Sequence, residues 1–267
     1  MKAVRQAVID IGSNTVRLVV YAGLPRAPLP IYNEKSRVKL GACLAGDGII
    51  DKATMKKALA ALVRFETLAK AMKVDTMRVV ATAATREAKN GAELVEKAAA
   101  LGIHVEVLDG DAEATAAGFG ILSDNPHANG YVGDLGGGSL ELIRISDGKL
   151  GTRVSLPLGT LRHDILKGKT TKQISQMLRD DIAKAVGKAG FPIETGLPFY
   201  MIGGSWRTFA RLHMHQTGYP LTILSNYEMP ADAPDMMMAM VNDKDALTRS
   251  NVVATGRISA LPGANAL

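Results

Sequence analysis

The chain contains two segments of nearly the same pattern, one at its start and one near its middle. Val8–Thr15 and Val132–Ser139 each give a short apolar run, an Asp, one apolar residue, a Gly and a cluster of small residues. A second apolar run follows each of them, at Val16–Tyr21 and at Leu140–Ile145. Apolar runs rich in Val and Ile and bounded by Gly and Ser are typical of strands. The pattern therefore predicts two β-hairpins, each with an Asp at the end of its first strand and a tight turn after it.

Both predicted turns have the composition of an anion-binding loop. Gly has no Cβ, so its backbone can approach an anion closely and direct N–H groups at it. An Asp beside such a turn can hold a hydrated Mg²⁺ that shares the phosphates of a substrate. One such turn is common in hairpins and means little alone. The same turn in two similar halves predicts a cleft with a phosphate-binding loop on each wall.

Elsewhere in the chain, strand and helix patterns alternate, as in α/β proteins. Turn-forming residues gather at 123–130, which predicts a linker and two domains, 1–124 and 125–267. Asp111 is expected to cap the helix that follows it. Strands are predicted at 77–81, 104–108 and 199–202, and helices at 51–72, 91–101, 112–122, 171–189 and after 203–204.

Composition narrows the class of partner. A chain of 267 residues with 47% hydrophobic content can bury two domain cores. Its net charge of +6 suits a polyanion, whereas its 4% aromatic content argues against a binder of single-stranded nucleic acid. Cys43 is the one cysteine, so no internal disulfide can form, and we expect it to be packed. We expect no membrane span and no signal peptide, and therefore a cytoplasmic protein.

The motifs of the chain resemble, in order, those of the exopolyphosphatase/guanosine pentaphosphate phosphatase family. Asp10–Val19 is similar to that family's opening D-I-G-S-N-S-x-R-L, and Asp134–Leu142 is similar to its D-I-G-G-G-S-x-E-L. The family belongs to the actin, sugar-kinase and heat-shock-chaperone ATPase superfamily. The resemblance implies an α/β fold of two similar ribonuclease H-like (actin-like ATPase) domains with an interdomain cleft. Further similar segments lie at 39–48, 82–90, 110–114, 156–162 and 203–207.

The resemblance and the chemistry of phosphoanhydride hydrolysis together suggest the phosphate-binding residues. The reaction needs an anion cradle, neutralisation of charge and a positioned water. Arg86 can grip phosphate oxygens in bidentate fashion, and the alternative is a surface ion pair with Glu87 or Glu66. The predicted phosphate-binding residues are Ser13, Asn14, Arg86, Gly136, Gly137, Gly138 and Ser139.

Four carboxylates complete the predicted site. Asp134 and Glu141 are expected to hold Mg²⁺ or to orient its waters. Asp10 is a third metal candidate, with capping of its own hairpin turn as the alternative. Glu113 corresponds to the catalytic Glu of the family and is expected to act as general base; the alternative is an acidic residue stabilised at a helix N-terminus. A monovalent cation such as K⁺ and a homodimer are compatible with the resemblance.

Three departures from the family pattern affect the functional hypothesis. Lys39 replaces the usual Arg, Ala112 replaces the first of two Glu residues, and the chain stops at Leu267, before the family's late S-x-x-G-L-R-E-G segment. We therefore expect a second domain that is short at its C-terminus. The predicted activity is a Mg²⁺-dependent exopolyphosphatase acting on inorganic polyphosphate. The alternatives are a guanosine pentaphosphate 5′-phosphohydrolase and a nucleotide-binding kinase, ATPase or regulatory protein of the same fold.

Overall fold

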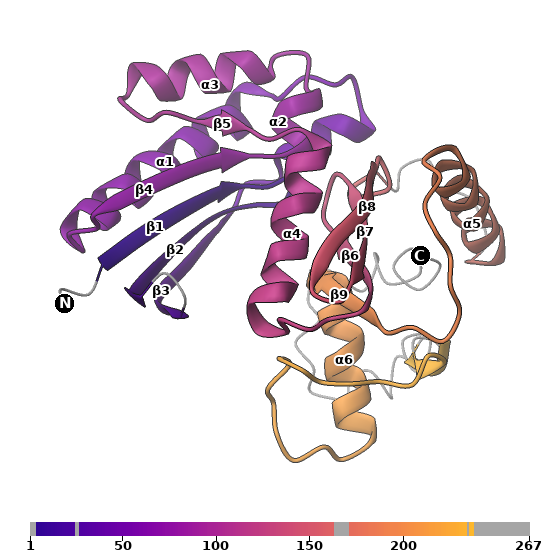
Figure 1. Cartoon of the computed structure of the whole chain (residues 1–267). Helices are drawn as coiled ribbons and strands as arrows, with labels where there is room; N and C mark the ends of the chain where they lie inside the picture. The colour runs from indigo at the N-terminus through magenta and orange to yellow at the C-terminus, as the bar shows by residue number, and fades with distance from the viewer. Residues whose placement is uncertain (1–3, 25–26, 163–170, 234, 238–267) are drawn as a thin grey trace. The chain divides into compact units, whose positions relative to one another are not determined.

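The chain forms two compact units, Met1–Glu113 and Ala114–Leu267. The computed structural model describes all residues except 1–3, 25–26, 163–170, 234 and 238–267 (Figure 1). The predicted domain boundary at residue 124 coincides with the end of a helix, whereas the compact units divide within that helix. Residues 125–129 connect this helix to the next strand inside the second unit. The expected shortening of the second domain at its C-terminus concerns residues 238–267, which lie outside the described residues.

A mixed sheet forms the centre of the first unit. Among the described residues it has five strands in the order β3-β2-β1-β4-β5. β1 pairs antiparallel with β2, as the predicted hairpin requires, and parallel with β4. β3 was not predicted, because most of its side chains are exposed and an unburied strand shows no apolar alternation. The bounds are Val4–Ile11 for β1, Thr15–Leu24 for β2, Ala27–Arg37 for β3, Thr76–Ala81 for β4 and Glu106–Val107 for β5.

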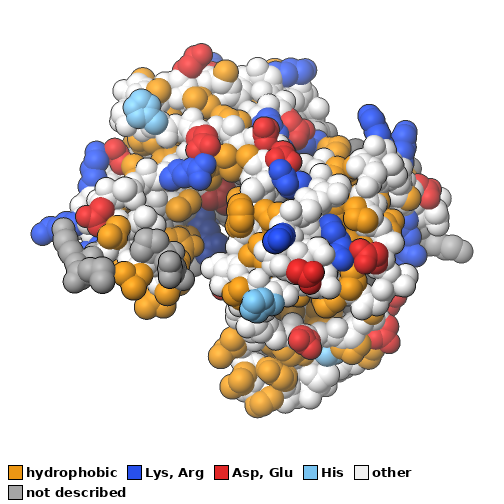
Figure 2. Space-filling view, in the orientation of Figure 1, with side chains coloured by type: hydrophobic (Ala, Val, Ile, Leu, Met, Phe, Trp, Pro, Cys, Tyr) orange, Lys and Arg blue, Asp and Glu red, His pale blue; other side chains and the backbone are white. Residues whose placement is uncertain are grey.

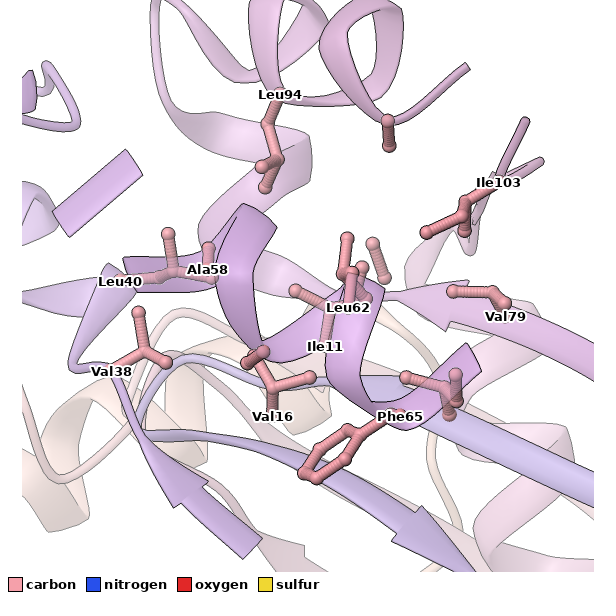
Figure 3. Packing of buried hydrophobic residues seen from close by; sticks show 14 of the residues in the cluster. Ile11, Val16, Val38, Leu40, Ala58, Leu62, Phe65, Val79, Leu94 and Ile103 are labelled. Atoms are coloured by element: carbon pink, nitrogen blue, oxygen red, sulfur yellow. The ribbon is translucent and has the colours of Figure 1, made fainter. Parts of the chain in front are cut away.

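Helices cover one face of this sheet. The 3-10 helix η1 (Leu40–Ala45) precedes α1 (Lys52–Ala71), and α2 (Ala83–Glu87) and α3 (Gly91–Ala100) follow β4. α1 begins where predicted, because Asp51 Oδ1 accepts a hydrogen bond from Thr54 N at 2.9 Å. Figure 3 shows its apolar face packed into a buried cluster. The labelled members of that cluster are Ile11, Val16, Val38, Leu40, Ala58, Leu62, Phe65, Val79, Leu94 and Ile103.

The alternation of side chains along β1 decides what each sheet face carries. Ile9 and Ile11 are fully buried in the cluster with α1. Successive strand residues point to opposite faces, so Asp10 lies on the face turned away from that cluster. Its register partner on β2 is Arg17. A polar pair therefore occupies the face of the sheet that the apolar core does not use. Cys43 packs at the edge of the core, as expected.

The helix α4 (Gly110–Asp124) begins earlier than predicted, and Asp111 is not its cap. Asp109 Oδ1 accepts a hydrogen bond from Ala112 N at 2.8 Å, and Asp109 O accepts one from Glu113 N at 3.0 Å. The Asp two residues earlier thus satisfies the free amides, and Asp111 lies within the first turn. This start places Glu113 in the first turn of the helix.

The second unit repeats the plan of the first. Its described sheet has four strands in the order β8-β7-β6-β9, again a hairpin extended by a third antiparallel strand and flanked by a parallel one. β8 was not predicted. The bounds are Gly130–Leu135 for β6, Leu140–Ser146 for β7, Lys149–Leu156 for β8 and Phe199–Gly203 for β9, with helices α5 (Thr171–Lys188) and α6 (Gly204–Gln216).

Two surface properties bear on the class of protein. Within the described part of the chain, no helix is long and apolar enough to cross a membrane. Figure 2 shows Lys and Arg side chains interspersed with Asp and Glu on the visible face. The net charge of +6 is therefore not gathered into a single basic area on that face.

Candidate functional site

Each of the two hairpin turns is closed by a backbone hydrogen bond at the equivalent position. Gly12 N donates to Thr15 O at 3.0 Å in the first unit, and Gly136 N donates to Ser139 O at 3.0 Å in the second. The similarity of the two sequence segments therefore extends to the local conformation of the turns. It also means that the Gly136 amide, which we predicted to face phosphate, is engaged inside its own turn.

The loop of the second unit turns its next three amides to one side. Thr160 N donates to Gly136 O at 3.1 Å, Leu161 N donates to Gly137 O at 2.8 Å, and the Gly138 carbonyl accepts from Arg162 Nε. In a trans peptide the C=O and the following N–H point in opposite directions. The N–H groups of Gly137, Gly138 and Ser139 therefore all point away from the segment 160–162. Successive amides directed to one side form a concave anion-binding site.

Glycine is required where this backing segment meets the loop. A Cβ on Gly159 would lie 2.3 Å from both C and N of Gly138, which is closer than real contacts allow. Backbone therefore packs directly on backbone at this point, and no side chain separates the segment from the loop.

The loop of the first unit is backed in a similar way. Gly41 N donates to Ser13 O at 2.7 Å, and the amides of Val38 and Lys39 donate to Asn14 O at 3.1 and 3.0 Å. The Asn14 amide therefore points away from the segment 38–41. The Oδ1 atom of Asn14 is buried and has no hydrogen-bond partner among the described residues. A buried polar atom without a partner costs about 1–3 kcal/mol, which a bound ligand or water would recover.

Glu113 is held by Arg86 of α2, the short helix that follows β4. Arg86 Nη1 donates to Glu113 Oε2 at 3.1 Å and to the carbonyl of Leu108 at 2.7 Å. Glu87, one of the partners expected for Arg86 in a surface ion pair, lies 4.0 Å from it. Arg86 thus contacts the predicted base.

Glu66, the other partner considered for Arg86, pairs with Lys70 at 2.7 Å. The local ion pair on α1 accounts for this carboxylate without Arg86. The surface alternative for Arg86 is therefore reduced to the loose contact with Glu87.

Burial sets the proton affinity of the two carboxylates near this point. Burial raises the pKa of Glu113, while the hydrogen bond and charge of Arg86 and, to a smaller extent, the Thr82 side chain oppose the rise. Burial also raises the pKa of Asp10 to about 6, with the negative charge of Glu113 adding to the effect and Arg17 opposing it. Carboxylates with raised proton affinity in a polar cluster are typical of functional sites. Glu113 has the properties of a proton acceptor for a water molecule.

The carboxylates of the second unit lie side by side on one hairpin. Asp134 on β6 and Glu141 on β7 are direct register partners. Glu141 is 1% exposed, and its Oε1 accepts a hydrogen bond from Ser155 Oγ at 2.7 Å. The described residues hold no cluster of three or more His, Cys, Asp or Glu side chains that could bind a metal ion. Mg²⁺ needs only one or two carboxylates besides water and phosphate, so this donor pair fits it.

Within each unit, the structure brings most of the predicted residues together. In the first unit, Arg86 contacts Glu113, whose charge acts on Asp10. Ser13 and Asn14 form the turn that starts shortly after Asp10. In the second unit, one hairpin carries the remaining candidates: Asp134, Gly136, Gly137, Gly138, Ser139 and Glu141.

Three residues of these environments were not predicted as site residues. Thr82 lowers the pKa of Glu113, Arg17 lowers the pKa of Asp10, and Arg162 donates a hydrogen bond to the Gly138 carbonyl. All three stand inside motif segments of the sequence, at 82–90, 10–19 and 156–162. Their position in those segments was the available signal, but it does not reveal which atom each side chain contacts.

A family model and solved structures both relate this chain to the Ppx/GppA phosphatase family. The model of the Ppx/GppA phosphatase family matches residues 19–254. The crystal structure of the Aquifex aeolicus member of that family is 22% identical, with a TM-score of 0.80 over 99% of this chain and 88% of that chain. An exopolyphosphatase from Cytophaga hutchinsonii is 22% identical, with a TM-score of 0.84 over 98% of this chain and 88% of that chain. These structures confirm the predicted two-domain α/β fold.

Proposed function

Because this chain belongs to the Ppx/GppA phosphatase family, we propose that it is an exopolyphosphatase that releases the terminal phosphate of inorganic polyphosphate. The observation that carries the proposal is the environment of Glu113. This carboxylate is mostly buried, has a raised pKa and is held by Arg86. A carboxylate fixed in this way can accept a proton from an attacking water, an effect worth on the order of 10²–10⁴ in rate.

The proposed reaction is an attack of water on the terminal phosphorus. Glu113 accepts one proton of the water as the new P–O bond forms. The bond between phosphorus and the bridging oxygen breaks, and that oxygen stays with the shortened chain. The products are orthophosphate and a polyphosphate one unit shorter. Little covalent chemistry falls to the protein, so binding and charge stabilisation dominate the catalysis.

The backbone loop of the second unit is the proposed anion cradle. The amides of Gly137, Gly138 and Ser139 point to one side, and they can donate to phosphate oxygens without a side chain. We propose that Arg86 also reaches phosphate oxygens when substrate is bound. The guanidinium has five N–H groups, so contact with Glu113 through Nη1 leaves further donors for the substrate.

Asp134 and Glu141 are proposed to hold Mg²⁺ through its water ligands. The cation would neutralise charge on the phosphate oxygens. A water-mediated site agrees with the burial of Glu141 and with its hydrogen bond from Ser155, which fixes the carboxylate in place. A metal-binding role for Asp10 and a requirement for a monovalent cation stay predictions.

Guanosine pentaphosphate is the second candidate substrate. The family is named for both exopolyphosphatases and guanosine pentaphosphate phosphatases, and the same catalytic groups serve both reactions. The net charge of +6 favours the longer polyanion. The dispersal of charges on the face in Figure 2 makes this preference weak. A direct comparison of phosphate release from the two substrates distinguishes these alternatives.

Phosphate release from polyphosphate, guanosine pentaphosphate and ATP, measured side by side with Mg²⁺, tests the proposal. We expect the highest kcat/KM for polyphosphate and little release from ATP. Glu113→Gln, purified in parallel, controls for contaminating phosphatases. Faster phosphate release from guanosine pentaphosphate than from polyphosphate would identify guanosine pentaphosphate as the substrate. Absence of release from all three would refute the proposed activity.

A further inference from the structure

The open face of the first sheet, which is turned away from the cluster with α1, carries a row of cations. Val16 and Leu18 of β2 are fully buried in that cluster. Arg17 lies between them in sequence, so its side chain is on the open face. Lys35 of β3 is the register partner of Arg17, and Arg37 follows it on the same face of that strand. We call these three residues, Arg17, Lys35 and Arg37, the cation row.

The charged groups of the cation row can be reached from solvent. Lys35 and Arg37 are exposed, and Arg17 is half-buried. Arg17 Nε donates a hydrogen bond to Asn33 Oδ1 at 3.0 Å, which orients the guanidinium on this face. That contact uses one of the five N–H donors of the group. The row therefore presents positive groups to which an anion can bind.

Cations outnumber acids on the open face. Among the described strand residues of this face, the acids are Asp10 and Glu106. Asp10 is the register partner of Arg17, and Glu106 pairs with Arg78 at 2.8 Å. The two cations of β3 add positive charge beyond these two pairs. A positive surface of this kind attracts polyanions.

The second unit provides an internal comparison, because it repeats the hairpin and its third strand. Asp134, Glu141 and Ser155 are in register across β6, β7 and β8, at the positions that correspond to Asp10 and the first two members of the row. Pro157 stands two residues after Ser155. The same plan thus folds without a cation at any of the three positions. The cation row is not a requirement of the fold, which favours a role in binding.

Protection of the sheet edge is the structural alternative for the cation row. Edge strands often carry Lys or Pro, which prevent pairing with another chain. β3 lies at the edge of the described sheet and already contains Pro28 and Pro30. Arg17 belongs to β2, which is paired on both sides. Edge protection therefore does not account for the whole row.

The cation row leads away from the groups that are proposed to react. Arg86 of α2, the helix after β4, contacts Glu113, and Glu113 acts on Asp10 of β1. Figure 1 shows β4, β1, β2 and β3 side by side in this order. Neighbouring strands lie about 5 Å apart, so the backbone of Lys35 is about 10 Å from that of Asp10. Arg37 lies about 7 Å further along β3.

From this arrangement we infer that the cation row binds the inner phosphates of a long polyphosphate chain whose terminal phosphate lies at Glu113. The inference rests on the proposed exopolyphosphatase activity and adds to it a preference for long chains. A short chain ends before it reaches β3. Single-stranded nucleic acid is the other polyanion that a basic surface can bind, and the 4% aromatic content of the chain disfavours it.

Two double variants with the same change in net charge form the comparison. Lys35→Ala/Arg37→Ala removes the exposed cations of the row. Lys56→Ala/Lys57→Ala is the matched control, because it removes two exposed cations from α1, which covers the opposite face of the sheet. Lys35→Arg/Arg37→Lys exchanges the two side chains and keeps both charges. Circular dichroism checks that all three variants are folded.

Binding of long-chain polyphosphate and of tripolyphosphate is measured by isothermal titration calorimetry in a Glu113→Gln background, which slows shortening of the chain during the measurement. We expect Lys35→Ala/Arg37→Ala to raise the Kd for the long chain by about tenfold, with a much smaller rise for tripolyphosphate. The exchange variant should keep most of the affinity, and Lys56→Ala/Lys57→Ala should bind as the background protein does. Equal losses in the two alanine variants, or equal losses for the two chain lengths, would overturn the inference.

The salt dependence gives a readout that a general loss of stability would not move. A bound polyanion releases counterions for each cation that it meets. The plot of log Kd against log salt concentration should therefore be less steep in Lys35→Ala/Arg37→Ala than in the control variant. An unchanged slope would count against direct contact between the row and the chain. Tighter binding of a single-stranded RNA oligonucleotide than of long-chain polyphosphate would also overturn the inference.

Failure of the proposed function is distinguishable from failure of this inference. If the wild type releases phosphate from none of the three substrates, the proposed activity fails, and the binding comparison still tests the row. A loss of affinity that is confined to the long chain then supports the row. If the wild type is active, the KM for long-chain polyphosphate should rise in Lys35→Ala/Arg37→Ala by a factor similar to that in Kd. An active enzyme with a wild-type KM in this variant would refute the inference alone.

Discussion

Arg86 and Glu113 form an ion pair, with 3.1 Å between Nη1 of the first and Oε2 of the second. Their side chains are 23% and 17% exposed, so solvent screens the pair only in part. Despite this cation, burial leaves the pKa of Glu113 raised. The pair therefore orients a carboxylate that still has a high proton affinity, which is the combination a general base needs.

Arg86→Ala should slow turnover and move the acidic limb of the pH profile to higher pH. Arg86 lowers the pKa of Glu113, so its removal lets burial raise that pKa further. We expect kcat/KM to fall by about tenfold or more, since charged hydrogen bonds are lost. Arg86→Lys should recover only part of the loss, because an ammonium group lacks the planar fork.

Arg78→Ala is the matched control for Arg86. Arg78 is 64% exposed and pairs with Glu106 on the surface. Exposed pairs of this kind contribute about 0–1 kcal/mol. The kcat and KM of Arg78→Ala should therefore stay at the wild-type values. Full activity in Arg86→Ala would show that Arg86 forms a structural ion pair and has no part in catalysis.

Glu113→Gln should lower kcat by roughly 10²-fold or more while polyphosphate binding stays similar. The amide keeps the size of the side chain but cannot accept the proton. Turnover and direct binding are to be measured across a Mg²⁺ titration. Restoration of turnover by excess Mg²⁺ would show that Glu113 is not the base.

Asp134→Asn should lose rate and Mg²⁺ response together, because its proposed role is to hold the hydrated cation. The measurement is the Mg²⁺ concentration that gives half-maximal turnover, which should rise well above the wild-type value. Glu113→Gln serves as the contrast, with low turnover but an unchanged Mg²⁺ midpoint. An unchanged midpoint in Asp134→Asn would remove this residue from the proposed metal site.

Gly159→Ala should raise the KM for polyphosphate on the order of tenfold, because the loop amides lose their alignment. The new Cβ would lie 2.3 Å from the Gly138 backbone, so the loop must move. Gly187→Ala in α5 is the control, since a Cβ there meets nothing within 4 Å. That change should leave KM alone and stabilise the protein by up to about 1 kcal/mol. A wild-type KM in Gly159→Ala would contradict the cradle assignment.

Asp10 should make the first unit less stable as pH rises. Its pKa is about 6 in the folded chain against 3.8 for the free side chain. The folded protein therefore holds a proton between these values that the unfolded chain has lost, and the stability this gives is lost as pH rises through 6. Asp10→Asn removes the effect, worth up to about 3 kcal/mol.

Urea unfolding of wild type and Asp10→Asn at pH 4.5 and pH 7.5, with EDTA present, measures this dependence. The stability of the variant relative to wild type should increase from the lower to the higher pH. Equal differences at the two pH values would show that Asp10 titrates normally.

The hairpins and their turns were predictable because local sequence determines them. Apolar runs and Gly residues act within a few positions, and the shared hydrogen bonds at Gly12 and Gly136 follow from the shared pattern. The strand β3 was missed because its exposed side chains give no period. The helix cap was assigned to Asp111 instead of Asp109 because two Asp residues flank Gly110 and both fit a cap signal.

The environment of Glu113 was only partly predictable. The resemblance identified Glu113 and Arg86 as separate site residues, but their contact spans a long stretch of sequence that the fold brings together. Glu87, the next residue in sequence, and Glu66 were the partners considered for Arg86 in the alternative surface ion pair. Thr82, whose side chain opposes the rise in the pKa of Glu113, was expected only as part of a motif.

Leu161 supports the loop of the second unit through its backbone, and this determines which residue types can occupy the position in related sequences. Its contribution to the loop is a backbone N–H that bonds the Gly137 carbonyl at 2.8 Å. Any residue with an amide hydrogen supplies that donor, and proline is the one standard residue that does not. A library of substitutions at this position should therefore tolerate diverse side chains in the anion-binding function and exclude proline, so that sequence variability here coexists with a fixed role.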